Sequence, residues 1–250
     1  MVTALITGAT RGIGRAVAVK LAASGISVAI VGRSDDTAQR VAHTIKEEGG
    51  DATSFVCDLA VREDLRELVE RVAQRLGAPT VLVHAAASHY QPKKLHHLTD
   101  DEIDALIEVD FMSAIHLCRD ILPFMVGHRF GRIVMLGSVA AQTGVRGGTL
   151  YAAAKAGLEG LVRGIAVDES RFGVTANVVR VGIADTERIA ERTAGDEKAK
   201  ERLVQATAIR RLPSAEEIAE LVAFLCSSAG AATTGSVIDA TAGAHLNLLW

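Results

Sequence analysis

The segment Thr7-Gly8-Ala9-Thr10-Arg11-Gly12-Ile13-Gly14 is the strongest indication of the fold, because it places three glycines directly after the apolar run Val2–Thr7. Gly8 permits a tight turn, Gly12 lets the backbone approach a pyrophosphate, and Gly14 allows a helix to pack closely on a strand. The segment that follows has the period of an amphipathic helix, so the turn opens a helix whose amide dipoles point at an anion. A purely structural turn is the alternative. The context favours the phosphate-binding turn of a dinucleotide site.

Short apolar runs recur along the chain and alternate with segments of helical period. Strands separated by crossover helices must pair in parallel, and right-handed crossovers place helices on both faces of the sheet. We therefore predict an α/β protein, a single Rossmann-type domain over residues 1–250 with a doubly wound parallel sheet of about seven strands. The predicted strands are Val2–Thr7, Ser27–Val31, Thr53–Val56, Val81–His84, Ile133–Leu136, Thr175–Val179 and Ser236–Ile238.

Residue pairs at two predicted helix starts support this reading. Thr99 with Glu102, and Ser214 with Glu217, have the spacing of capping boxes. The one long irregular stretch, residues 182–210, follows the sixth predicted strand. Because ligands bind beyond the carboxyl ends of the strands in such sheets, we predict a helical substrate lid there, with a solvated helical excursion as the alternative.

Composition excludes several classes of protein. The formal net charge is −3 with acidic and basic residues mixed throughout, so no basic stripe is present to bind nucleic acid. The apolar run at the N-terminus is interrupted far short of the roughly 20 residues of a membrane span, which predicts neither signal peptide nor membrane anchor. Cys57, Cys118 and Cys226 are odd in number and far apart, so they form neither a disulfide framework nor a metal pair. A reducing cytoplasm suits such a chain.

The residues after the second predicted strand bear on the choice of cofactor. An NAD enzyme carries a carboxylate there, whereas this chain has Arg33, and Arg11 in the turn can approach the same place. A guanidinium forks onto a 2′-phosphate, so NADP(H) is favoured over NAD(H). Asp35 and Asp36 come one or two residues too late, and we expect Asp36 to cap the next helix. Asp58, after the third strand, can hold an adenine amino group or simply close a turn.

A serine, a tyrosine and a lysine suggest the chemistry. Ser138 follows the fifth predicted strand, and Tyr151 and Lys155 are spaced i, i+4 in a helical run, so phenol and ammonium share a face. A nearby ammonium favours the phenolate form, which lets the phenol exchange a proton near neutral pH. When hydride reaches a carbonyl carbon, the oxygen gains charge that Ser138 can hydrogen-bond and Tyr151 can protonate. A surface tyrosine beside a lysine is the plain alternative, but the glycine turn argues against it.

Several motifs spread along the chain are the Thr7–Gly14 turn, Asp58, Ser138, the run Tyr151–Leu158 and Asn177. Together they resemble the short-chain dehydrogenase/reductase family over the whole chain, and the 3-oxoacyl-[acyl-carrier-protein] reductases most closely. The resemblance implies the catalytic roles given above and a homotetramer, or a homodimer, built through two long helices and the last strand. It also implies that Lys155 binds the nicotinamide ribose. The full set of expected cofactor contacts is Gly8, Thr10, Arg11, Gly12, Ile13, Gly14, Arg33, Asp58, Leu59, Ala86, Tyr151, Lys155, Gly182, Ile183 and Thr186.

Three departures from the family fall around the expected nicotinamide. The usual Asn-Asn-Ala-Gly after the fourth strand is His84–Ala87, a relay asparagine in the fourth helix is Asp110, and Pro-Gly after the sixth strand begins with Val181. An ionised Asp110, which we add to the catalytic set, would offset the effect of Lys155 on the Tyr151 proton. The sequence therefore predicts a higher pH optimum than is usual for the family.

The remaining polar residues give weaker indications. Histidines cluster after the fourth strand without ligand spacing, so we predict no metal site. His89 and Tyr90 are candidates for substrate contact because they lie past a strand's carboxyl end, and Arg129 is a candidate contact for an acidic acyl carrier protein, with a solvated loop arginine as its alternative. Residues expected to shape the substrate pocket are Ala140, Gln142, Val145, Arg146 and Ile183.

Two families of function stay open at this point. One is an NADPH-dependent reductase of a ketone, either a 3-oxoacyl thioester or, as a tailoring reductase or alcohol dehydrogenase, a small or polycyclic carbonyl compound. The other is a nucleotide-binding member of the fold that has lost efficient chemistry, which the clustered departures suggest and the retained Ser138, Tyr151 and Lys155 oppose.

Overall fold

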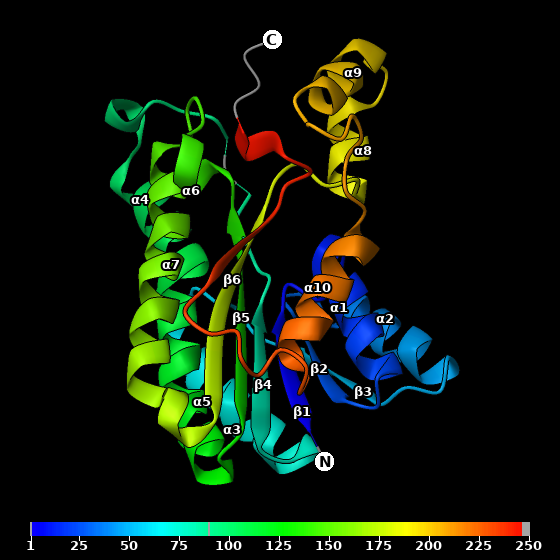
Figure 1. Ribbon diagram of the computed structural model, residues 1–250, viewed down its shortest axis with the longest axis vertical. Helices are drawn as coiled ribbons and strands as arrows, with labels where there is room; N and C mark the ends of the chain where they lie inside the picture. The colour runs from blue at the N-terminus through cyan, green and yellow to red at the C-terminus, as the bar shows by residue number, and fades with distance from the viewer. Residues whose placement is uncertain (1, 90, 247–250) are drawn as a thin grey trace.

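The structure, a computed structural model, describes residues 2–89 and 91–246. Its centre is a parallel sheet of seven strands in the order β3-β2-β1-β4-β5-β6-β7 (Figure 1). The order reverses between β1 and β4, which is the switch point where α/β sheets of this kind bind ligands. The predicted doubly wound sheet is confirmed. The strands are β1 (Thr3–Thr7), β2 (Ser27–Gly32), β3 (Ala52–Val56), β4 (Pro79–His84), β5 (Gly131–Ser138), β6 (Val174–Val181) and β7 (Val237–Ala240).

Helices cover both faces of the sheet. Helices α1, α2 and α10 pack on one face, where Ile6, Val17 and Val222 belong to one apolar cluster. Helices α3, α5 and α7 pack on the other, around a second cluster that includes Leu82 and Leu158. Strands buried on both sides need apolar residues throughout, which is why the runs do not alternate. The helices are α1 (Gly12–Ala23), α2 (Asp35–Glu47), α3 (Arg62–Leu76), α4 (Asp100–Ile107), α5 (Ser113–His128), α6 (Ala140–Thr143), α7 (Thr149–Glu169), α8 (Glu187–Thr193), α9 (Glu197–Gln205) and α10 (Ala215–Cys226).

The boundary predictions were right at two helices and wrong at one. Both capping boxes are present, with Thr99 capping α4 and Ser214 capping α10. Asp36 does not cap α2, because the helix already begins at Asp35 and Ser34 takes the N-cap position without a side-chain hydrogen bond. Asp36 lies in the first turn instead, where its charge still favours the helix dipole.

A π-helical turn, η2 (Glu108–Met112), joins α4 to α5 and carries the buried Asp110. Such turns interrupt α-helices chiefly at functional sites. The loop from β6 leads into α8 and α9, which stand above α10 in Figure 1, so residues 182–210 are largely helical, as expected. Their role as a lid stays a prediction.

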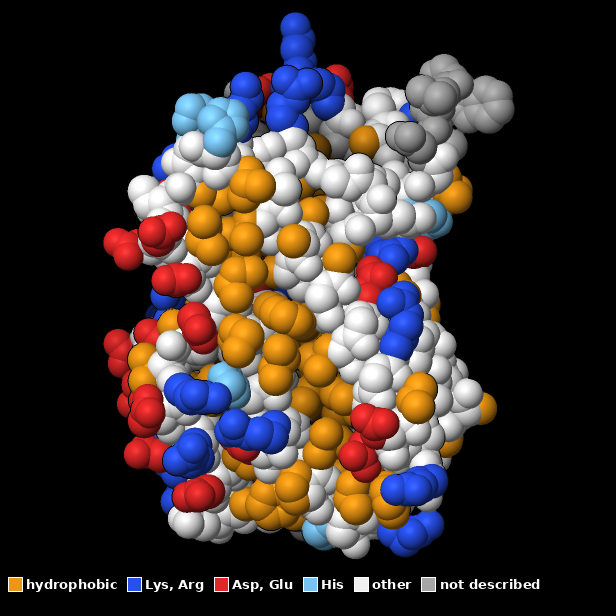
Figure 2. Space-filling view, turned by 90° about the vertical axis from the view of Figure 1, so that its left-hand side faces the viewer, with side chains coloured by type: hydrophobic (Ala, Val, Ile, Leu, Met, Phe, Trp, Pro, Cys, Tyr) orange, Lys and Arg blue, Asp and Glu red, His pale blue; other side chains and the backbone are white. Residues whose placement is uncertain are grey.

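Hydrophobic side chains also gather on one outer face of the molecule. Figure 2 shows them as a long band on the side where α5 and α7 lie. Val167 on α7 is 85% exposed, and Leu122, Phe124 and Leu161 are only partly buried. No helix within the described ranges is both long and apolar enough to cross a bilayer.

Candidate active site

The glycine turn adopts a backbone that its sequence makes possible. Gly8 and Gly12 have φ angles of +65° and +54°, a region that side chains disfavour. Gly14 lies under the turn, where an added Cβ would collide with the carbonyl oxygen of Gly8. The turn therefore closes tightly on the start of α1 and leaves the first amides of that helix without intrahelical partners.

Contacts across the sheet bring other predicted residues to this turn. A Cβ on Gly8 would lie 2.8 Å from Cα of Ala86, so the loop after β4 passes directly against the turn. A Cβ on Gly32, at the end of β2, would lie 2.5 Å from Cγ2 of Thr10, which sets the exposed Arg33 beside the turn. Residues that are distant in sequence therefore share one edge of the sheet.

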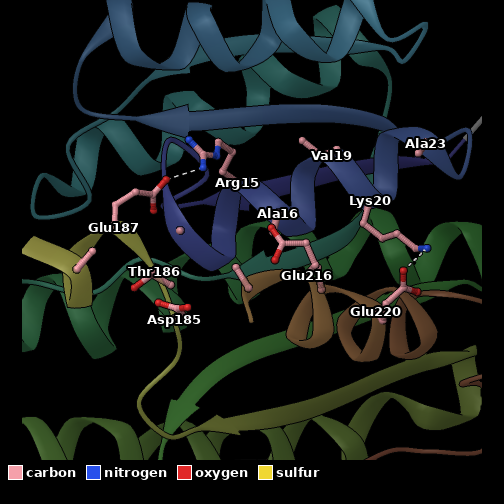
Figure 3. A pocket seen from close by; sticks show the side chains of 14 residues that line it. Arg15, Ala16, Val19, Lys20, Ala23, Asp185, Thr186, Glu187, Glu216 and Glu220 are labelled. Carbon is pink, nitrogen blue, oxygen red and sulfur yellow. Dashed lines mark hydrogen bonds and ion pairs between the residues drawn. The ribbon is translucent and has the colours of Figure 1, made fainter. Parts of the chain in front are cut away.

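The start of α8 also reaches the turn. A Cβ on Gly12 would lie 3.6 Å from Cγ2 of Thr186, the residue before α8. Next to it, Glu187 forms an ion pair with Arg15 of α1, with Oε1 and Nη2 separated by 2.5 Å (Figure 3). Sequence reasoning missed this pair, whose members are 172 residues apart.

The other expected cofactor residues lie in less distinctive surroundings. Ile13 and Leu59 are apolar residues that pack into the two core clusters. Asp58 is exposed, and its Oδ1 accepts a hydrogen bond from the amide of Ala60, so it closes a turn and still faces solvent. A Cβ on Gly182, which precedes the partly buried Ile183, would meet Cα of Thr241 at 3.2 Å.

Ser138 lies at the carboxyl end of β5, and Tyr151 and Lys155 lie together on α7. Ser138 is the last residue of β5, which ends two residues later than the predicted end at Leu136. Its hydroxyl accepts a hydrogen bond from the amide of Ala140. Lys155 Nζ lies 5.7 Å from the centroid of the Tyr151 ring, on the same face of α7. Lys155 is only 2% exposed, so its ammonium acts on the phenol through little solvent.

Asp110 supplies the opposite charge to this buried ammonium. Its Oδ1 lies 3.3 Å from Lys155 Nζ, an ion-pair contact outside hydrogen-bond geometry, and its Oδ2 accepts a bond from the amide of Ser88 at 2.7 Å. Neither side chain of the pair is more than 2% exposed. Breaking a buried pair from one side leaves an uncompensated charge, so the two residues depend on each other.

His84 is buried under the same region. Its Nδ1 lies 3.0 Å from the hydroxyl of Thr7, and that hydroxyl also accepts a bond from the amide of Ala86. Burial, assisted by the charge of Lys155, lowers the pKa of His84 to about 3, so the imidazole is neutral. The side chain thus ties the end of β4 to the phosphate turn on β1.

A cavity of about 240 Å³ opens beside Tyr151. Leu98, Leu106 and Leu150 make part of its lining apolar, and His89 also lines it. His89 Nδ1 also lies 3.4 Å from Nη2 of Arg188 on α8, so the start of α8 approaches this pocket. The role of His89 in substrate contact stays a prediction, and Tyr90, the other residue named in that prediction, lies outside the described residues.

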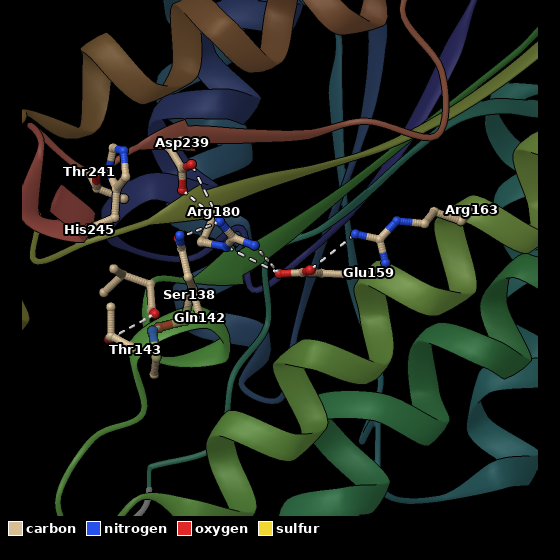
Figure 4. A network of polar contacts seen from close by, with 11 residues as sticks. Ser138, Gln142, Thr143, Glu159, Arg163, Arg180, Asp239, Thr241 and His245 are labelled. Atoms are coloured by element: carbon tan, nitrogen blue, oxygen red, sulfur yellow. Dashed lines mark hydrogen bonds and ion pairs between the residues drawn. The ribbon is translucent and has the colours of Figure 1, made fainter.

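A second polar network, which was not predicted from the sequence, links β6 to α7 and β7 (Figure 4). Arg180 on β6 contacts Glu159 on α7 at 2.8 Å and Asp239 on β7 at 3.0 Å. It also donates to Gln142 at 2.7 Å, which holds this expected pocket residue in place. Burial opposes the charge of Arg180, but bonds to the two carboxylates outweigh burial and raise its pKa. The sequence did offer one signal of this network, because Arg180 is the only charged residue in β6.

The remaining expectations can be located briefly. Asn177 is buried and holds the chain near Thr233 and Ser236, a structural role. Arg129 is exposed at the end of α5 and donates to the carbonyl of Arg171. Within the ranges the structure describes, no group of His, Cys, Asp or Glu could hold a metal ion.

Known proteins share this architecture over its whole length. A family model described as enoyl-(acyl carrier protein) reductase matches residues 8–245. The chain is 35% identical to the 3-oxoacyl-[acyl-carrier-protein] reductase of Pseudomonas aeruginosa, covering 98% of this chain and 97% of that protein. A putative oxidoreductase of Bacillus subtilis is 34% identical, with 97% and 96% covered.

A solved structure agrees with these sequence matches. It is a 3-oxoacyl (acyl-carrier-protein) reductase from Agrobacterium tumefaciens with NADP bound, with a TM-score of 0.92 and 31% identity over 97% of this chain and 93% of that one. The strand order, the glycine turn and the Ser-Tyr-Lys arrangement are thus found in a chain that aligns with such proteins from end to end. The chain belongs to the short-chain dehydrogenase/reductase family.

Proposed function

We propose that this chain is a reductase that transfers hydride from NADPH to a ketone carbonyl, with a 3-oxoacyl thioester or a related carbonyl compound as substrate. As a member of its family it is an NADP-dependent oxidoreductase. The observation that carries the proposal is the buried ammonium of Lys155 beside the Tyr151 ring, next to a pocket at the carboxyl ends of the strands. This arrangement supplies a proton where a reduced carbonyl oxygen needs one.

The residues around the turn fit a dinucleotide. Gly8 and Gly14 let the turn pack tightly against the loop after β4 and the start of α1, because a Cβ on either would collide with backbone atoms, and the amides at the start of α1 suit a pyrophosphate. Arg11 and Arg33 are both exposed, and neither guanidinium has a hydrogen bond or ion pair within the described parts of the chain. Two such groups beside the ribose position favour a 2′-phosphate, and thus NADP(H) over NAD(H).

The side chains of the catalytic end divide the chemistry between them. Bound NADPH supplies the hydride. Ser138 donates a hydrogen bond to the carbonyl oxygen, and Tyr151 gives that oxygen its proton. Lys155 stabilises the phenolate that remains and holds the cofactor ribose, while Asp110 partly balances the ammonium. Run in reverse, the same groups oxidise an alcohol.

The cavity beside Tyr151 supports an acyl arm on the substrate. Its leucine-rich wall favours an apolar chain, and Leu106 is a buried part of that wall. A thioester carried by coenzyme A or by an acyl carrier protein would present such a chain. Arg129 is the candidate contact for an acidic carrier, because it is exposed and cationic.

The test is to mix the pure protein with NADPH and acetoacetyl-CoA and to follow the loss of NADPH absorbance. Tyr151→Phe removes the proton donor and should lower kcat about 100- to 10,000-fold while NADPH still binds. Turnover only of small or polycyclic ketones would favour the tailoring reductase. NADPH binding without turnover of any carbonyl compound would favour the non-catalytic alternative, and preference for NADH would contradict the arginine argument.

We further propose a homotetramer assembled through α5, α7 and β7, in a reducing cytoplasm. The band of hydrophobic side chains on the side of α5 and α7 supports this assembly (Figure 2). Light scattering should give the mass of four chains. Val167→Glu should lower that mass. Val145→Glu makes the same substitution at an exposed valine outside α5 and α7, and it should leave the mass unchanged.

A further inference from the structure

The first residue of the lid segment's helix α8 lies against the start of α1 (Figure 3). Glu187 pairs with Arg15, one turn into α1, and a Cβ on Gly12 would lie 3.9 Å from Glu187 Oε2. Gly12 is the first residue of α1. One carboxylate thus reaches both a cation and the free amide end of the helix.

The electrostatics of Glu187 agree with this placement. Its pKa is lowered first by its own backbone amide, against the opposing effect of burial, and then by the charge of Arg15 and the backbone amide of Gly12. The amide of Gly12 is one of those that an α-helix leaves unsatisfied at its N-terminus. These amides are the groups that bind a phosphate in a dinucleotide turn. Glu187 therefore uses the same kind of donor that a pyrophosphate needs.

We propose that Glu187 determines cofactor affinity as an internal anion: in the free protein it holds the phosphate-binding end of α1, and a dinucleotide must displace it in order to bind. This inference rests on the proposed function. Displacement would break the pair with Arg15 and release the start of α8 from α1. Because Thr186, the residue before α8, also lies against Gly12, the same event would free the lid segment to move as the cofactor enters.

The surroundings give the displaced side chain somewhere to go. A groove of about 580 Å³ runs between α1 and α10, with Ala16, Val19 and Ala219 along its floor. The pair of Arg15 with Glu187 stands at one end, and a pair of Lys20 with Glu220 at 2.5 Å stands at the other (Figure 3). The Glu187 side chain is 43% exposed, so it can leave Gly12 for water without a buried charge being created.

The experiment is to titrate the wild-type protein and the Glu187→Gln variant with NADPH at low ionic strength. We expect the variant to bind NADPH about two- to fivefold more tightly, because a charge near a helix terminus has an effect of that size. The difference should shrink as salt is added, since both partners are partly exposed. Glu191→Gln, one turn further along α8 and exposed, is the matched control and should bind as the wild type does.

A second ligand separates displacement from a general change of charge. Adenosine 2′-monophosphate has the 2′-phosphate but no pyrophosphate, so its affinity should be the same for the wild type and for Glu187→Gln. Equal or weaker NADPH binding by Glu187→Gln would overturn the inference and leave the proposed function standing. Equal tightening for both ligands would also overturn it. If neither the wild-type protein nor any variant binds NADPH, the proposed function is wrong, and this inference is wrong with it.

Discussion

The two ends of the crevice are built differently: the phosphate end consists mainly of backbone, and the catalytic end consists of buried ionisable side chains. At the phosphate end, Gly8 and Gly14 are packed so closely against backbone that a Cβ on either would collide with it. At the catalytic end, Lys155, Asp110 and His84 are each 2% exposed or less. We therefore expect the phosphate end to be sensitive to added atoms and the catalytic end to be sensitive to changes of charge.

Adding one methyl group at the phosphate end should have the largest effect. Gly14→Ala places a Cβ against the carbonyl oxygen of Gly8, so the turn must shift. We expect loss of NADPH binding and a fall of about 1–3 kcal/mol in the free energy of unfolding. Calorimetric titration and urea unfolding measure the two. Gly127→Ala, where nothing lies within 4 Å, is the control and should leave both unchanged or improve stability. Normal NADPH binding by Gly14→Ala would remove the contrast between the two ends.

Removing the buried imidazole should change how stability depends on pH. The pKa of His84 falls from 6.5 to about 3 on folding, so between these values the unfolded chain holds the extra proton. Wild-type stability should therefore drop as pH falls below 6.5, by at most about 1.4 kcal/mol per pH unit from this group. His84→Asn, which can still contact Thr7, should lose this part of the slope.

Urea unfolding at pH values between 7 and 4.5 checks the effect of His84. The exposed His43 provides the control, because its side chain is 73% exposed and His43→Asn should follow the wild-type curve. Parallel curves for His84→Asn and the wild type would mean that the histidine is not held neutral in the fold.

Neutralising Asp110 should move activity along the pH scale. Its carboxylate opposes the effect of Lys155 on the Tyr151 proton, so Asp110→Asn should lower the pH optimum of kcat. Asp104→Asn, an exposed change on α4, serves as the control. An unchanged pH profile for Asp110→Asn would discard this account of the pair.

The smallest expected effect concerns the three cysteines, whose thiols should not react with an alkylating reagent in the native protein. Burial, as the first cause in each case, raises the pKa of Cys57, Cys118 and Cys226 to about 12. Thiols react as thiolates, so iodoacetamide at mild alkaline pH should modify none of them in the native protein and all three in urea. Rapid native labelling of Cys57, after β3, but not of Cys118, on α5, would show that the phosphate side opens more readily.

Local patterns made most of the fold predictable. The glycine turn, the apolar runs and the two capping boxes are each decided by residues close together in sequence. The lengths of β5 and β6 were underestimated, because Gly131, Gly137 and Arg180 interrupt apolar runs that parallel hydrogen bonding nevertheless continues through. The pattern of apolar residues in one sequence does not show how far the hydrogen bonds between two neighbouring strands extend.

The site was less predictable where it depends on pairs distant in sequence. The contact between Asp110 and Lys155 was expected only through the family resemblance, and that of Glu187 with Arg15 was not expected at all. Arg180 was visible as a charge in a strand, but nothing in the sequence named its partners. Charge pairing across a fold depends on tertiary geometry, which single-sequence periodicity does not contain.

The π-helical turn Glu108–Met112 has a consequence for how such a protein can change over evolution. A turn of this kind holds one residue more than its α-helical neighbours, which resets the angular phase between the helix before it and the helix after it. Deleting one residue there would restore a continuous α-helix and rotate everything on one side by about 100°. Either Asp110 would then point away from Lys155, or the outer face of α5 would turn away from solvent. The fold should therefore tolerate substitutions along α5 but not the deletion of a single residue from this turn.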